Sequence, residues 1–166
     1  MKKTIKIISL LFIILCLNSC FIGKSIQSSK ARSEFTEEND AIPPNFGKFE
    51  HTVIVGILKG RRSYDKYLKS AFKKNYNGAY VLLTREELKK PEYRNMSKYR
   101  YVFDYTLGTT RSTIYSDGLS SSVTLKRYYV EDRIEDKIYQ SGAEFSYFAK
   151  AMKIYVANLE KKRLLK

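Results

Sequence analysis

The sequence is poor in the side chains that most catalytic and metal sites use. It has one histidine, His51, and two cysteines, Cys16 and Cys20. No cysteine follows Cys20, so residues 21–166 contain no thiol for a Cys–His pair, and a Ser–His–Asp triad would have to use His51, which opens a predicted strand. Zinc sites need Cys and His clusters, and calcium loops need closely spaced oxygen ligands with glycine, so we expect no metal and no cofactor. His51 is expected to be a surface or strand-end residue.

Glycine and acidic residues are also scarce. The eight glycines are scattered, so none of them forms a phosphate-cradling loop. Glycoside hydrolysis needs only two acids, which leaves a carboxylate-using enzyme open. Asp104 is the most interesting acid, because it lies in a strand pattern among aromatic residues, but an ion pair with Arg100 is its expected role. The acidic run at 131–136 is expected to be a solvated hairpin bend, with a cation site as the alternative.

The apolar run near the amino terminus is too short to span a bilayer. Residues 7–17 are apolar apart from Ser9, and three lysines stand within the first six positions. A transmembrane helix needs about 20 apolar residues, whereas a basic start and roughly 7 to 15 apolar residues are typical of a secretory signal peptide. Residues 1–19 are therefore predicted to be a signal peptide.

The ending of this segment adds a second signal. The letters LNSC at 17–20 resemble the lipobox of bacterial lipoproteins, in which cleavage occurs just before a cysteine that carries lipid. The resemblance implies diacylglycerol on the sulfur of Cys20 and attachment to a membrane of the cell envelope. If the cell has two membranes, Phe21 and Ile22 carry no acidic retention signal, so the expected place is the outer membrane, facing the periplasm. The alternative is an uncleaved anchor with an incidental cysteine.

Basic residues outnumber acidic ones. The chain has 31 Lys and Arg against 17 Asp and Glu, a net charge of +14, and loss of the three lysines in the signal peptide leaves +11. In a cytosolic protein this charge together with 14 tyrosines would suggest nucleic acid, but export argues against that partner. The expected partner is an anionic envelope component, such as a phospholipid headgroup, an acidic polysaccharide or a cell-wall polymer, or an acidic protein.

The segment after the signal peptide is predicted to be a tether. Residues 21–48 show no sustained apolar periodicity and contain a Pro43–Pro44 pair. Residues 20–48 are thus expected to be a lipidated cysteine and a flexible coil with a reach of roughly 30 Å. The alternative is a strand or short helix packed on the domain. Residues 49–166 are predicted to form a single domain, held by its core without disulfides.

Periodicity within 49–166 predicts the order of the elements. Apolar runs predict strands at 53–58 and 79–84, and the helix expected at 61–76 between them makes these two strands parallel. Period-two alternation predicts a strand at 98–107, and Asp117-Gly118 predicts a turn within the β-rich segment that follows. A short strand at 137–140 completes a mixed sheet of about five strands.

The last predicted element is a long amphipathic helix. Ser141 and Glu144 are spaced as in a capping box. Five apolar residues then recur at helical spacing: Phe145, Phe148, Met152, Tyr155 and Leu159. This stripe is expected to pack on the sheet, with a ligand or partner surface as the alternative. The order β-α-β-β-β-β-α predicts an α+β fold with both main helices on one face of the sheet.

The first predicted helix carries a basic stripe. At 100° per residue its cations fall within about 60° of one another, nearly opposite the apolar side of the helix. The members of the stripe are Arg62, Lys66, Lys69 and Lys73. The stripe is either a solvated face or an anion-contacting surface.

These observations favour a lipid-anchored, non-enzymatic binding or assembly module of a bacterial envelope. The alternatives are a small carboxylate-using enzyme acting on envelope glycans, and a lipid or glycan carrier that uses the tyrosine-rich face of the sheet. An acidic pair in a concave pocket would favour the enzyme, a deep dry cavity the carrier, and a flat basic surface the module.

Overall fold

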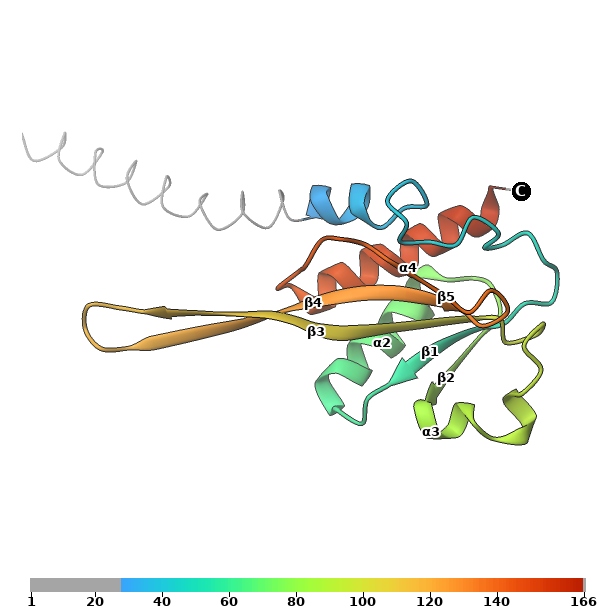
Figure 1. Ribbon diagram of the computed structural model, residues 1–166, viewed down its shortest axis with the longest axis horizontal. Helices are drawn as coiled ribbons and strands as arrows, with labels where there is room; N and C mark the ends of the chain where they lie inside the picture. The colour runs from blue at the N-terminus through green and yellow to red at the C-terminus, as the bar shows by residue number, and fades with distance from the viewer. Residues whose placement is uncertain (1–27, 166) are drawn as a thin grey trace, which may run out of the picture.

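The computed structural model describes residues 28–165, so the predicted signal peptide and Cys20 lie outside the described residues (Figure 1). Residues 28–34 are helical. The elements that follow are β1 (Ile54–Leu58), α2 (Arg62–Asn75), β2 (Tyr80–Thr84), α3 (Arg85–Leu88), the 3-10 helix η1 (Pro91–Tyr93), β3 (Tyr101–Ile114), β4 (Ser120–Asp132), β5 (Lys137–Gln140) and α4 (Phe148–Leu164). No helix within 28–165 has both the length and the apolar character needed to cross a membrane.

The strands form one mixed sheet in the order β2-β1-β3-β4-β5. β1 pairs in parallel with both β2 and β3, whereas the β3–β4 and β4–β5 pairs are antiparallel. The β1–β2 pairing is parallel because α2 connects the two strands as a crossover. The predicted fold class is confirmed: the chain has an α+β fold with a five-stranded mixed sheet.

Helices α2 and α4 lie next to each other on one face of the sheet (Figure 1). Successive strand residues point to opposite faces, so β3 turns Tyr101, Phe103 and Tyr105 toward these helices. The apolar stripe predicted from the sequence is buried in the same core: Phe145, Phe148, Met152, Tyr155 and Leu159. The expectation that this stripe is core material is confirmed.

The opposite face of the sheet holds a smaller apolar cluster. It is formed by Val55 and Ile57 of β1, Leu83 of β2, Leu88 of α3 and Val102 of β3. β1 is therefore covered on both sides, as its unbroken apolar run predicted.

The tether prediction is wrong for residues 28–48, which are part of the domain. Phe35 is fully buried, and its ring centroid lies 4.5 Å from that of Tyr155 in α4. Ile42 and Phe46 are also buried, and the hydroxyl of Tyr155 donates to the carbonyl of Ala41. The buried positions Ser28, Ala31 and Phe35 of this segment keep helical spacing, but only Phe35 is a large apolar side chain, and Ile42 and Phe46 follow outside the helix, so the sequence shows no sustained apolar period.

The predicted capping box at Ser141 and Glu144 is also wrong. Ser141 instead accepts a hydrogen bond from the amide of Ala143, 3.1 Å away, in the turn before α4. A capping box does occur at α3, where the Thr84 hydroxyl accepts from the Glu87 amide and the Glu87 carboxylate accepts from the Thr84 amide.

The ends of β3 and β4 project from the body as a two-stranded arm, residues 107–124 (Figure 1). The pairing register shifts between Leu107 and Thr110, where the arm leaves the body. Gly118 has φ +81° at the tip, a backbone conformation that glycine adopts without strain, which confirms the predicted turn. Almost all side chains of the arm are exposed.

Candidate functional site

The basic stripe covers the outer side of α2. Arg62, Lys66, Lys69 and Lys73 are all exposed, whereas Leu68, Ala71 and Phe72 of the same helix are buried. Within residues 28–165 none of the four cations forms an ion pair or a side-chain hydrogen bond. The structure therefore presents four unpaired positive charges on one helix face.

Local interactions fix the start and end of this helix. The amide of Lys59 donates to the Asp65 carboxylate at 3.0 Å, which ties the loop before α2 to its first turn. Lys73 and Lys74 stand in the last turn, where positive charge stabilises the helix dipole. Lys73 thus has a structural role as well, which makes Arg62, Lys66 and Lys69 the more informative members of the stripe.

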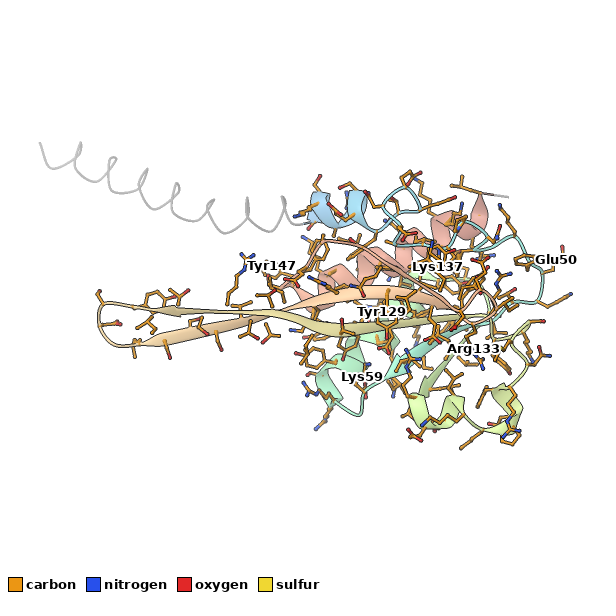
Figure 2. The ribbon with its side chains drawn as sticks, viewed as in Figure 1. Glu50, Lys59, Tyr129, Arg133, Lys137 and Tyr147 are labelled. Atoms are coloured by element: carbon orange, nitrogen blue, oxygen red, sulfur yellow. The ribbon has the colours of Figure 1, made fainter. Side chains whose placement is uncertain are left out.

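Asp104 does not pair with Arg100, contrary to the sequence expectation. The Asp104 side chain is only 1% exposed and accepts from Lys59 at 2.6 Å, Arg85 at 2.9 Å and the Tyr129 hydroxyl at 3.1 Å. Tyr129 lies between Tyr128 and Val130, which point into the core under α2 and α4, so its side chain is on the opposite face of the sheet; Figure 2 labels Lys59 and Tyr129. Burial, followed by the negative charge of Asp104, raises the pKa of Tyr129 to about 12.

Arg85 joins this cluster to a second acid. Its guanidinium also contacts Glu131 at 2.8 Å. Burial disfavours the charged form of Arg85, but its bonds to Glu131 and Asp104 outweigh burial and raise its pKa. Both carboxylate oxygens of Asp104 therefore accept hydrogen bonds from neighbouring segments, and neither is free to act as a general acid or base.

The acidic run at 131–136 is more ordered than the expected solvated bend. Asp132 is fully buried and pairs with Arg100 at 2.7 Å, and Arg100 also contacts Glu135 at 2.9 Å. Asp132 also accepts hydrogen bonds from the amides of Ile134 and Glu135, which closes the turn. The part of the chain that the structure describes contains no group of three or more His, Cys, Asp or Glu side chains arranged to hold a metal ion.

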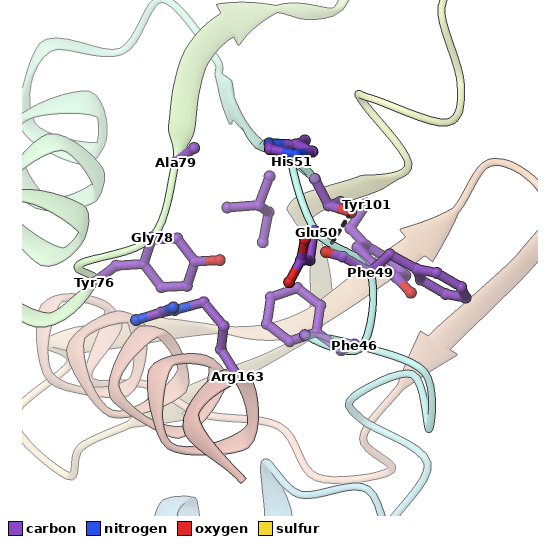
Figure 3. Close-up of a pocket in the computed structure, with 12 residues that line it drawn as sticks. Phe46, Phe49, Glu50, His51, Tyr76, Gly78, Ala79, Tyr101 and Arg163 are labelled. Atoms are coloured by element: carbon purple, nitrogen blue, oxygen red, sulfur yellow. Dashed lines mark hydrogen bonds between the residues drawn. The ribbon is translucent and has the colours of Figure 1, made fainter. Parts of the chain in front are cut away.

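A cavity of about 300 Å³ (Figure 3) is lined in part by Glu50, which Figure 2 labels at the end of the body remote from the arm. Tyr76 and Tyr101 line it together with Arg163, and Figure 3 shows the Tyr76 hydroxyl turned toward its middle. The buried hydroxyl of Tyr101 has no hydrogen-bond partner among the described residues. Glu50 and His51 stand at the edge of the cavity, and His51 is exposed, as expected from the sequence.

A second hollow, here named the arm groove, lies at the root of the arm. It has a volume of about 420 Å³, and its lining includes Lys30, Arg111, Arg127 and Glu144. Arg127 pairs with Glu144 at 2.9 Å. Lys30 and Arg111 form no ion pair within residues 28–165. Sequence reasoning missed this grouping because the cations come from three segments that only the fold brings together.

Comparison with known proteins identifies no relative. No protein-family model and no curated protein matches the sequence. Among solved structures, the dodecamer of a single-residue variant of PelC from Paraburkholderia phytofirmans is similar over 66% of this chain and 88% of its own, with a TM-score of 0.37 and 12% sequence identity. A similarity this low supports no inference about family or function.

Proposed function

We propose that the chain is a lipid-anchored, non-enzymatic binding or assembly module of a bacterial envelope, and that the basic stripe contacts an anionic envelope component or an acidic protein. The unpaired cations of the stripe are the observation that carries this proposal. Folding uses the inner face of α2 for the core and leaves these charges outside, so they can bind an anion without breaking any contact of the fold.

The two alternatives find less support in the geometry. Asp104 and Glu131 share Arg85, and Asp132 and Glu135 share Arg100. None of these four acids lines the two cavities described above. The remote cavity has Arg163, Glu50 and His51 among its lining, so it is not the deep dry space that a lipid carrier needs.

Anchoring is assigned to Cys20, on the resemblance of 17–20 to a lipobox. Two or three acyl chains bury many methylene groups, each worth roughly 0.8 kcal/mol, and so hold a protein stably on a membrane. The proposed location is the outer membrane, facing the periplasm, in a cell with two membranes.

The test removes charge from the stripe without changing the core. The triple variant Arg62→Gln, Lys66→Gln, Lys69→Gln is expected to melt like the wild type, and to capture less cross-linked partner with a weaker dependence on salt. The matched control removes three cations from the opposite side of the sheet: Lys90→Gln, Arg94→Gln and Lys98→Gln. This control has the same net charge and should bind like the wild type.

Two outcomes would contradict the proposal. If both triple variants lose capture equally, net charge and not the stripe attracts the partner. If the Cys20→Ser protein resists salt and carbonate washing of membranes as the wild type does, the lipid anchor is wrong.

A further inference from the structure

The tip of the arm is apolar although it projects into solvent. Ile114 is 79% exposed, Tyr115 52% and Leu119 66%, and they flank the turn that contains Gly118. None of them supports the core, and an isolated two-stranded hairpin is only marginally stable in water. Exposed apolar side chains gathered on a projecting element mark a contact surface.

Positive charge lies directly behind this tip. Arg111 precedes Ile114 by three residues on the same strand, a distance of about 10 Å. Lys30 and Arg111 both line the arm groove. The one acid of the arm, Asp117, accepts a hydrogen bond from the Leu119 amide at 3.0 Å within the turn. An apolar tip followed by cations at this spacing matches the boundary of a bilayer, where apolar and tyrosine side chains enter the interface and cations meet anionic headgroups.

The start of the described chain lies at the same end of the molecule. Lys30 lines the arm groove, and Figure 1 shows the helix at 28–34 beside the root of the arm. Cys20 precedes Ser28 by eight residues, so the covalent chain between them spans at most about 29 Å. The strand from Leu107 to Ile114 covers about 23 Å. A membrane that holds lipid on Cys20 is therefore within reach of the arm.

We propose that the arm docks on the surface of an anionic bilayer, with Ile114, Tyr115 and Leu119 in the interface and Lys30 and Arg111 at the headgroups. This inference rests on the lipid anchor of the proposed function and adds an orientation to it. In this orientation the arm faces the membrane. Figure 2 labels Glu50, which lines the remote cavity, at the opposite end of the body from Tyr147, so this cavity faces away from the membrane.

The test uses the absence of tryptophan from the sequence. Tyr115→Trp places a single fluorescent probe at the tip of the full-length, lipidated protein. In vesicles of phosphatidylglycerol and phosphatidylcholine its emission should shift to the blue, and brominated lipids should quench it. Phe49→Trp is the control, because Phe49 is 47% exposed but lines the remote cavity. Its emission should change little.

A second set of variants tests which side chains cause insertion. Adding Ile114→Ser and Leu119→Ser to Tyr115→Trp should remove most of the quenching. Ile138→Ser, which removes a 55% exposed isoleucine from β5, should leave it unchanged. Arg111→Gln should weaken docking on phosphatidylglycerol roughly fivefold, since one cation near an anionic surface contributes about 1 kcal/mol.

The results separate this inference from the function on which it rests. Protein that fails to sediment with the vesicles contradicts the lipid anchor and the docking arm together. If the protein sediments but the probe at position 115 is quenched no more than the probe at position 49, the proposed docking of the arm is wrong and the lipid anchor stands. Equal quenching in pure phosphatidylcholine overturns the role of Lys30 and Arg111.

Discussion

Phe148 is the side chain through which the two large helices and the sheet contact one another. It begins α4 and is 8% exposed. Its ring centroid lies 4.4 Å from that of Tyr64 in α2 and 4.8 Å from that of Tyr105 in β3. The hydroxyl of Tyr128 donates to the Phe148 carbonyl at 3.3 Å. Phe148→Ala would therefore remove contacts to both layers and leave the backbone bond in place.

The expected loss of stability is large. Truncation of a buried phenylalanine to alanine costs about 3–5 kcal/mol, and each favourable ring pair contributes about 0.5–1.5 kcal/mol beyond the buried area. Phe148 contacts two rings closely, so the upper half of this range applies. A domain of this size has a total stability of about 5–15 kcal/mol. The melting temperature should fall by about 8–20 °C.

Urea unfolding followed by circular dichroism measures the effect. Lys153→Ala is the control, because Lys153 is exposed on the same helix and its loss should change stability by no more than about 0.5 kcal/mol. The denaturant slope should stay the same in both variants, so the shift of the midpoint gives the change in free energy. Equal midpoints for the two variants would refute the assignment of the buried face of α4.

Two further variants or conditions test the fold. Gly47 has φ +86°, and a methyl group there would lie 2.6 Å from the Arg163 Cα. Gly47→Ala should therefore lower the free energy of unfolding by about 2–4 kcal/mol, against about 1 kcal/mol for the control Gly118→Ala, whose methyl group would meet open space. Equal losses in urea unfolding would show that residues 44–47 do not dock on α4. Burial raises the pKa of Tyr129 to about 12. Stability from this phenol is complete below its unfolded pKa of about 10 and is lost as pH rises to 12. If Tyr129→Phe removes a phenolate absorbance change with its midpoint near pH 10 in the folded protein, the raised pKa is wrong.

Elements with strong local periodicity were predictable. Each predicted pattern comes from the side chains that a single element packs against the core. Examples are the apolar run of β1, the alternation along β3, and the helical spacing of Phe148, Met152 and Tyr155 in α4. A period of about 3.6 or 2 residues is visible in the sequence whenever one face of an element is buried. In residues 28–48 the buried positions at helical spacing are Ser28, Ala31 and Phe35, and the first two are too small to stand out as an apolar period in the sequence.

The ion-pair partners of Arg100 and Asp104 could not be predicted from the sequence of one strand. Arg100 and Asp104 are four residues apart, which places them about 13 Å from each other along an extended chain. Their real partners come from neighbouring elements. Asp104 lies opposite Tyr129 in the β3–β4 register, and Asp132 lies opposite Tyr101, next to Arg100. The pairing depends on register, which the sequence of β3 alone does not contain.

The acids and the cations of the domain differ in where they lie. The buried acids Asp104 and Asp132 are used inside the domain, where each holds cations from other segments. Among residues 28–165, the cations of the stripe on α2 and Lys30 and Arg111 at the root of the arm are among those that remain outside without an ion pair. The binding proposed for the stripe is electrostatic, so it should weaken as salt shortens the Debye length to about 8 Å and below. The docking proposed for the arm would also bury Ile114 and Leu119, which are exposed in the structure. Salt does not screen the burial of apolar surface, so the two proposed contacts should differ in their dependence on salt.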